Sequence, residues 1–148
     1  MSRHIRKYQC KKSTLLKYHE IIECIMAALD AKSPYTAGHS KRVSDMVEIL
    51  CRLLGLNRMM HIAAHLHDIV KIGIDDAILN KEGKLDEQEW EMMKTHPQIG
   101  ANILDKSHLL APFSKIVLHH HERYGLNGKE IPLGLRIIAL CDSIDTMT

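Results

Sequence analysis

Histidine is the residue type in this chain with the clearest capacity for chemistry. The chain of 148 residues contains 11 histidines, and several of them are close together in the sequence. Two clusters stand out: His61, His65 and His67, and His119, His120 and His121. Because neutral imidazole is a common ligand of transition metals, such clustering indicates a metal site.

His67 is followed directly by an aspartate, Asp68. Neighbouring residues of a helix point in different directions, so both side chains can reach one metal only where the helix ends or is distorted. Turn-forming residues after Asp68, among them Gly73, predict such an end. Mixed imidazole and carboxylate ligands suit Fe, Mn, Zn, Ni or Co better than Ca or Mg. By itself, however, a His-Asp dipeptide is more often structural.

Two residues far from this dipeptide are also candidates. His39 falls on the same helical face as Val43, so we expect it to point inward as a ligand or as a core histidine. Asp142 lies within an apolar run, where a buried carboxylate needs a partner. A metal would serve, and so would a salt bridge to Arg136 or Arg42.

Three further histidines complete the candidates. His96 precedes a proline at an expected helix start, and His120 and His121 follow an apolar run. Seven inward-facing nitrogen and oxygen ligands on several helices suit two metals that keep positions open for water and substrate. Of the remaining histidines, we expect His65 to lie in the core or to support a ligand, His61 to be exposed and His119 to point away.

The elements that would position these residues are helices. Apolar residues recur at helical spacing, and Pro34, Gly55 and the capping pair Asp86 and Glu89 delimit segments. The expected helices lie at about residues 15–32, 39–54, 57–68, 86–93, 97–104, 112–121 and 133–144, with an irregular connection over 71–84. The sequence therefore predicts an all-α bundle of about six to seven helices.

The length of the chain predicts one globular domain with one core. The net charge of +2 favours neither a nucleic acid polymer nor a membrane surface as a partner. No apolar run has the length of a membrane span, and the first residues do not resemble a signal peptide. Three cysteines lie among apolar residues and suggest buried free thiols: Cys24, Cys51 and Cys141. Free thiols are typical of a reducing compartment, so we expect a cytoplasmic protein.

Six motifs, in order and with near-family spacing, resemble those of bacterial HD-GYP domains, a branch of the HD superfamily of metal-dependent phosphohydrolases. The resemblance covers about residues 27–148, which implies a domain over residues 27–148 with an N-terminal helix within residues 1–26 leading into it. The matching segments are Tyr35–Val43, His67–Ile74, Ile78–Leu85, Met93–Pro97, His120–Arg123 and Arg136–Asp145.

The resemblance implies a helical bundle that holds two, sometimes three, metal ions, commonly iron or manganese, and hydrolyses cyclic di-GMP. It implies that Asp68 bridges the metals, that Lys71 holds a phosphate oxygen, and that Arg123 binds substrate or orders a loop. Ser33, Tyr35 and Thr36 provide no carboxylate for a third metal, so we expect two. The implied ligands are His39, His67, Asp68, His96, His120, His121 and Asp142.

Three features depart from the family pattern. The Gly-Tyr-Pro tripeptide is missing from the loop at Tyr124–Pro132, which puts the substrate in question. Val70 replaces a glycine, and we expect its bulk to narrow the pocket or to shift Lys71. The chain ends early at Thr148, which could leave an apolar edge that favours a homodimer. Two alternatives to cyclic di-GMP hydrolysis therefore stay open: hydrolysis of another nucleotide or phosphoester, and a binding module with little turnover.

Overall fold

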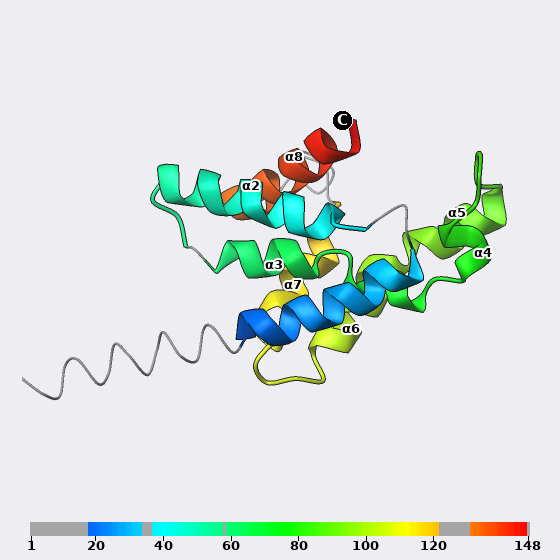
Figure 1. Cartoon of the computed structure of the whole chain (residues 1–148), viewed down its shortest axis with the longest axis horizontal. Helices are drawn as coiled ribbons and strands as arrows, with labels where there is room; N and C mark the ends of the chain where they lie inside the picture. Colours follow the sequence, from blue (N-terminus) through cyan, green and yellow to red (C-terminus); the bar gives the residue numbers. More distant parts are fainter. Residues whose placement is uncertain (1–17, 34–36, 58, 122–130, 148) are drawn as a thin grey trace, which may run out of the picture.

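The computed structural model describes residues 18–33, 37–57, 59–121 and 131–147, and these residues are helical with no strand among them (Figure 1). This confirms the predicted all-α bundle. The helices are residues 18–32, α2 (His39–Leu53), α3 (Met60–Leu66), the 3-10 helix η2 (Ile69–Gly73), α4 (Asp76–Leu79), α5 (Glu87–Lys94), α6 (His96–Leu104), α7 (Ala111–His119) and α8 (Leu133–Met147).

Several helix boundaries lie where local sequence signals place them. Asp86 and Glu89 form the predicted capping box, each side chain accepting a hydrogen bond from the backbone amide of the other residue. Gly55 adopts a φ of 66° just after α2, a conformation that ends helices and that glycine reaches without strain. Pro112 lies in the first turn of α7, where its missing amide hydrogen costs nothing.

Other boundaries differ from the sequence expectation. The connection over residues 71–84, predicted to be irregular, contains the last part of η2 and the whole of α4. Both helices are too short for a clear periodic pattern. The helix before the paired histidines ends at His119, so His120 and His121 lie beyond its last turn. Cys51 and Cys141 are buried as expected, whereas Cys24 is exposed, and Cys10 lies outside the described residues.

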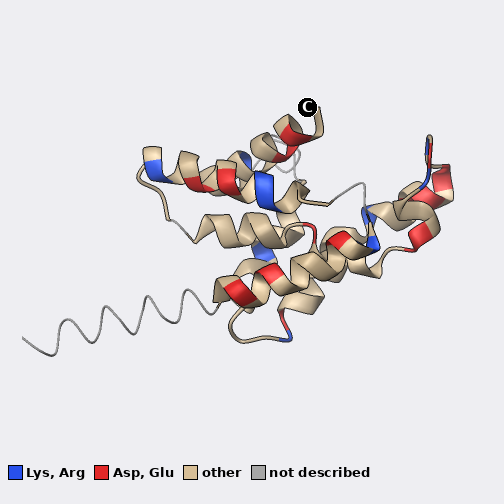
Figure 2. Cartoon of the chain, in the orientation of Figure 1, with Lys and Arg blue, Asp and Glu red and all other residues tan. Residues whose placement is uncertain are grey.

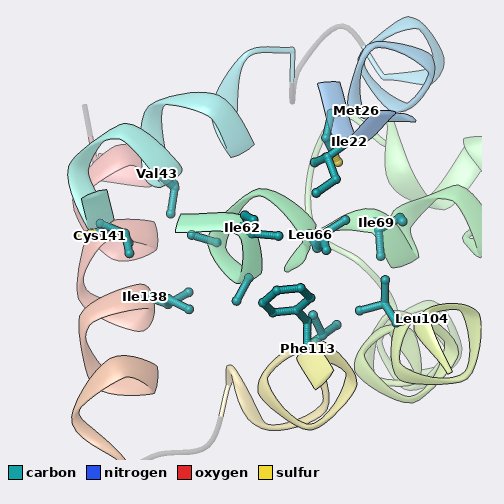
Figure 3. Packing of buried hydrophobic residues seen from close by; sticks show 14 of the residues in the cluster. Ile22, Met26, Val43, Ile62, Leu66, Ile69, Leu104, Phe113, Ile138 and Cys141 are labelled. Atoms are coloured by element: carbon teal, nitrogen blue, oxygen red, sulfur yellow. The ribbon is translucent and has the colours of Figure 1, made fainter. Parts of the chain in front are cut away.

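The central element of the bundle is α3. Its residues Ile62, Ala63, Ala64 and Leu66 are at most 1% exposed, and the helix contains no Asp, Glu, Lys or Arg. A helix without a charged face is stable when other elements surround it. Figure 3 shows Ile62 and Leu66 between side chains of every neighbouring layer. Those neighbours are Ile22 and Met26 of the helix 18–32, Val43 of α2, Phe113 of α7, Leu104 of α6 and Ile138 of α8.

The helix of residues 18–32 contributes Ile22, Met26 and Leu29 to this same core. The domain boundary after residue 26 stays a prediction. Lysine and arginine are interspersed with aspartate and glutamate along the described helices (Figure 2). None of the helices in the described ranges combines the length and the apolar character that a bilayer crossing requires.

Gly100 allows α6 to pack closely on η2 and α7. A Cβ atom at this position would lie 2.8 Å from Cγ2 of Val70 and 3.0 Å from Cγ1 of Val117. Both valines are fully buried and β-branched, so neither side chain can move aside. The η2 segment, which directly follows His67 and Asp68, thus packs closely on α6 at Gly100.

We expect Gly100→Ala to destabilise the protein. Alanine improves helix propensity by about 1 kcal/mol, but overpacking a closed core costs about 1–3 kcal/mol, so the free energy of unfolding should fall. Urea denaturation measures the change. Gly134→Ala in α8 is the matched control, because its Cβ would meet only the flexible end of Met60. In the double variant with Val70→Ala, the loss should be smaller than the sum of the two single losses. Strict additivity would contradict the packing argument.

Candidate metal centre

The seven predicted ligands come together inside the bundle. Two groups, each with ligand atoms within 4.8 Å of one another, are found among the described residues: His39, His67 and Asp142, and His96, His120 and His121. The rings of His67 and His120 connect the groups, with centroids 5.5 Å apart in an edge-to-face arrangement. Ligands supplied by several helices therefore form two adjacent sets.

Three of the histidines are oriented by the same backbone device. Nδ1 donates to the carbonyl oxygen three residues earlier, from His67 to Ala64 at 2.5 Å, from His96 to Met93 at 2.6 Å, and from His120 to Val117. Each carbonyl belongs to the last turn of a helix, where carbonyls lack the usual amide partner four residues further on. Because a carbonyl can only accept, the hydrogen is on Nδ1. In the neutral ring, Nε2 therefore keeps a free lone pair for a metal.

His39 is oriented by a carboxylate instead. Its Nδ1 lies 2.7 Å from Oδ2 of Asp145, whose two oxygens also receive bonds from Nε and Nη2 of Arg42 at 2.7 and 2.9 Å. A bidentate guanidinium fixes the carboxylate plane and so the histidine ring. Hydrogen bonds to Asp142 and Asp145 outweigh burial and raise the pKa of His39.

Two carboxylates face the first histidine group. Oδ2 of Asp68 lies 3.5 Å from Nε2 of both His39 and His67, and Oδ1 of Asp142 lies 3.1 Å from His39 Nε2. Burial opposes ionisation, but His67 and Lys71 hold the pKa of Asp68 well below its usual range. Against the same burial, His39 and His67 lower the pKa of Asp142. Both groups are therefore anions, as metal ligation requires.

The second histidine group has a different electrostatic character. Nε2 of His121 lies 2.8 Å from Nε2 of His96, and the ring centroids of His120 and His121 are 3.9 Å apart. Burial and the neighbouring His121 lower the pKa of His120 to about 3, and burial lowers that of His96. Both rings are thus neutral at physiological pH, the form in which imidazole binds a metal.

The strongest sign that metals fit here is a pair of buried atoms without partners. Among the described residues, Nε2 of His67 and Nε2 of His120 are buried and make no hydrogen bond. The nearest oxygen of Asp142 is 3.7 Å from His67 Nε2, too far for a hydrogen bond. A buried polar atom without a partner costs about 1–3 kcal/mol, so its presence calls for an explanation. Metal ligation satisfies both atoms.

A cavity of about 450 Å³ opens beside the first group. Its size lies within the usual range for small-molecule sites, about 300–1,000 Å³. Lys71 lines it, and its Nζ donates to Oδ2 of Asp68 at 2.6 Å. The other residues that line it are His39, Arg42, Asp68, His121, Asp142, Asp145 and Thr146. The cavity is thus lined by carboxylates of the candidate site and by two cationic side chains, those of Lys71 and Arg42.

Two sequence expectations and one open alternative about this region are wrong. Val70 does not line the cavity, because its side chain is buried against Gly100, so it does not narrow the pocket, whereas a shift of Lys71 stays a prediction. Of the alternatives left open for Asp142, the salt bridge to Arg42 is not formed, because Arg42 binds Asp145 instead. His61 is 9% exposed and therefore buried, because the helix 18–32 brings His19 against it.

His65 is buried, as predicted, and His119 belongs to neither candidate group. Oδ2 of Asp68 is close to the first histidine group, so its bridging to the second stays a prediction. Most of the loop at Tyr124–Pro132 lies outside the described residues. So do three residues named in the sequence predictions: Tyr35, Thr36 and Arg123.

The functional residue that sequence reasoning missed is Asp145. In the sequence it is only the last residue of the matching motif Arg136–Asp145, yet it orients His39 and binds Arg42. One signal could have found it: Asp145 is three residues after Asp142 on α8, so both carboxylates share one face of that helix. The partner across that face, however, is set by the packing of α8 on α2.

Comparison with known proteins agrees with the motifs. A family model described as the HD domain matches residues 36–147. The 3′3′-cGAMP-specific phosphodiesterase 3 of Vibrio cholerae is 40% identical over 142 residues, which cover 86% of this chain and 31% of that protein. The cyclic di-GMP phosphodiesterase response regulator RpfG of Xanthomonas campestris is 36% identical over 141 residues, covering 86% and 37%.

A cyclic di-GMP phosphodiesterase of Thermotoga maritima is also 36% identical over 141 residues, covering 86% of this chain and 38% of that protein. The chain spans about a third of the length of these relatives. The family model covers most of the chain, including the described residues of both candidate metal groups. The chain therefore belongs to the HD domain family.

Proposed function

We propose that this domain is a metal-dependent phosphodiesterase that hydrolyses a cyclic dinucleotide, with cyclic di-GMP as the expected substrate. The observation that carries the proposal is the pair of buried, unpartnered Nε2 atoms of His67 and His120 beside two ionised carboxylates. The names of the relatives support the substrate class, since they specify cyclic di-GMP or 3′3′-cGAMP.

The cofactors would be two divalent transition-metal ions, Fe or Mn first, with Zn, Ni and Co compatible with the same ligands. His39, His67 and Asp142 would hold one ion, and His96, His120 and His121 the other. Asp68 would bridge the two. The backbone bonds to Nδ1 favour this arrangement, because they fix the ring orientations in advance and leave Nε2 for the metal.

When bound, the ions supply polarisation of the phosphoryl group and activation of a water for attack on phosphorus. Asp68 and Asp142 would place negative charge beside the ions. Lys71 is placed at the cavity by Asp68, and its ammonium can donate to a phosphoryl oxygen whose negative charge grows in the transition state. By the family resemblance, Arg123, which lies outside the described residues, would bind the substrate or order a loop.

One observation favours a second candidate function. The loop at Tyr124–Pro132 lacks the Gly-Tyr-Pro tripeptide, and in HD-GYP domains that loop lies near the substrate pocket. The same metal site could then act on another nucleotide or phosphoester, or bind cyclic di-GMP with little turnover.

A direct assay separates these functions. Protein loaded with Mn or, without oxygen, with Fe(II) is incubated with cyclic di-GMP, 3′3′-cGAMP and a panel of phosphomonoesters, and products are resolved by chromatography. We expect linear dinucleotide or mononucleotide from at least one cyclic dinucleotide. Turnover of panel compounds alone would favour the second candidate. Tight cyclic di-GMP binding by calorimetry without product would indicate a binding module and contradict the proposed reaction.

Metal content tests the ligands independently of turnover. We expect about two transition-metal ions per chain by elemental analysis, since the ligands form two groups. His96→Gln and Asp142→Asn should each lose at least one ion, because each removes a ligand from a different group. His119→Gln is the matched control and should keep both. Equal metal content in all four proteins would refute the ligand assignment.

Lys71→Met should slow turnover without removing metal. The loss of one charged donor to the transition state costs about 100-fold in kcat, while KM should change little if the contact strengthens only in the transition state. Steady-state kinetics and elemental analysis on the same preparation measure both quantities. Lys41→Met, on the exposed face of α2, is the control. A tenfold rise in KM with unchanged kcat would show instead that Lys71 binds the ground state.

A further inference from the structure

Lys32, the last residue of the helix 18–32, holds a segment that is distant in sequence. Its Nζ donates to the carbonyl oxygens of Ile72 at 2.8 Å and Ile74 at 2.6 Å, and it lies 3.2 Å from Oδ1 of Asp76. The side chain is only 22% exposed. An ammonium has three hydrogens, so these three acceptors fully occupy it.

The segment it holds is the end of η2, which apolar burial fixes only in part. Ile69, Val70 and Ile74 are buried, whereas Ile72 between them is 45% exposed. Apolar burial therefore holds the two ends of this segment but not the exposed side at Ile72. A 3-10 helix of five residues has weak internal hydrogen bonds, and its last carbonyls carry partial negative charge. The partly buried ammonium of Lys32 binds at that end and adds a polar restraint.

The position of Lys71 depends on this short helix. Its amide donates to the carbonyl of Asp68 at 2.9 Å, and its own carbonyl accepts from the amide of Ile74 at 3.2 Å. Residues on both sides of Lys71 are thus tied together, and Lys32 binds the carbonyls of the next residue and of Ile74. Any movement at this end of η2 shifts the backbone from which the Lys71 side chain reaches the cavity.

The same turn of the helix 18–32 also contacts the approach to His39. Oδ2 of Asp30 accepts from the amide of Gly38 at 3.0 Å, and Gly38 is the left-handed residue just before α2. In Figure 1 the end of the helix 18–32 lies beside the segment that follows α3. Asp30 thus contacts the backbone next to His39, and Lys32 contacts the backbone next to Lys71.

We propose that Lys32 is a positioning residue for Lys71. Through Lys32, the helix of residues 18–32 sets the position of the Lys71 side chain at the cavity and so affects kcat. The part concerning catalysis rests on the proposed function, whereas the part concerning the restraint of η2 does not. A displacement of this helix would remove the restraint on the segment that carries Lys71.

Hydrogen exchange on the whole chain tests the restraint without any substrate. In Lys32→Met, the amides of Lys71 and Ile74 should exchange about tenfold faster, because the charge-assisted bonds that hold η2 are gone. Lys41→Met should leave these rates unchanged. In Lys32→Arg the same two amides should exchange as slowly as in the wild-type protein, since a guanidinium can also donate to the two carbonyls. Equal rates at these two amides in the methionine variants would overturn the proposal.

Kinetics test the consequence for catalysis. In Lys32→Met we expect kcat to fall about tenfold, with KM and metal content unchanged and with recovery in Lys32→Arg. In a Lys71→Met background the same change should cost almost nothing further, because the residue it positions is absent. Full additivity of the two losses would show that Lys32 does not act through Lys71. If the wild-type protein turns over no cyclic dinucleotide, the proposed function fails, and the exchange rates alone decide for or against the restraint.

Discussion

The hydrogen bond from a histidine Nδ1 to a last-turn carbonyl is the interaction on which this site depends most. It recurs at His67, His96 and His120, each time to the residue three positions earlier. The free carbonyls at a helix end are usually satisfied by water or by capping groups. Here they fix three imidazole rings, select the tautomer, and leave Nε2 pointing toward neighbouring ligands. The candidate metal centre is therefore built at helix ends.

The bundle places those helix ends side by side. Because α3 has no Asp, Glu, Lys or Arg and is buried from His61 to Leu66, it occupies the centre of the fold, and its last turn brings His67 and Asp68 into the middle of the molecule. The close approach of α6 at Gly100 brings His96 to the same region, and α7 brings His120. Burial then neutralises the second histidine group and leaves the carboxylates of the first group as the main anions.

Around this centre, each of the two cationic side chains that line the cavity is fixed by a carboxylate. Lys71 donates to Asp68, and Arg42, which is 57% exposed, binds both oxygens of Asp145. Asp68 and Asp145 also contact His39, so they connect the candidate metal ligands to the cations that face the cavity.

The sequence by itself determined the helical class, the capping of α5 and the seven candidate ligands, because these follow from periodicity, local hydrogen bonding and residue chemistry. It could not determine which carboxylate pairs with Arg42, since Asp142 and Asp145 share a helix face and only the packing of α8 on α2 chooses between them. Nor could it reveal that His61 is buried, that Val70 faces Gly100 instead of the cavity, or that Lys32 caps η2. Each of these depends on contacts between residues far apart in the chain, and such contacts exist only once the helices have packed.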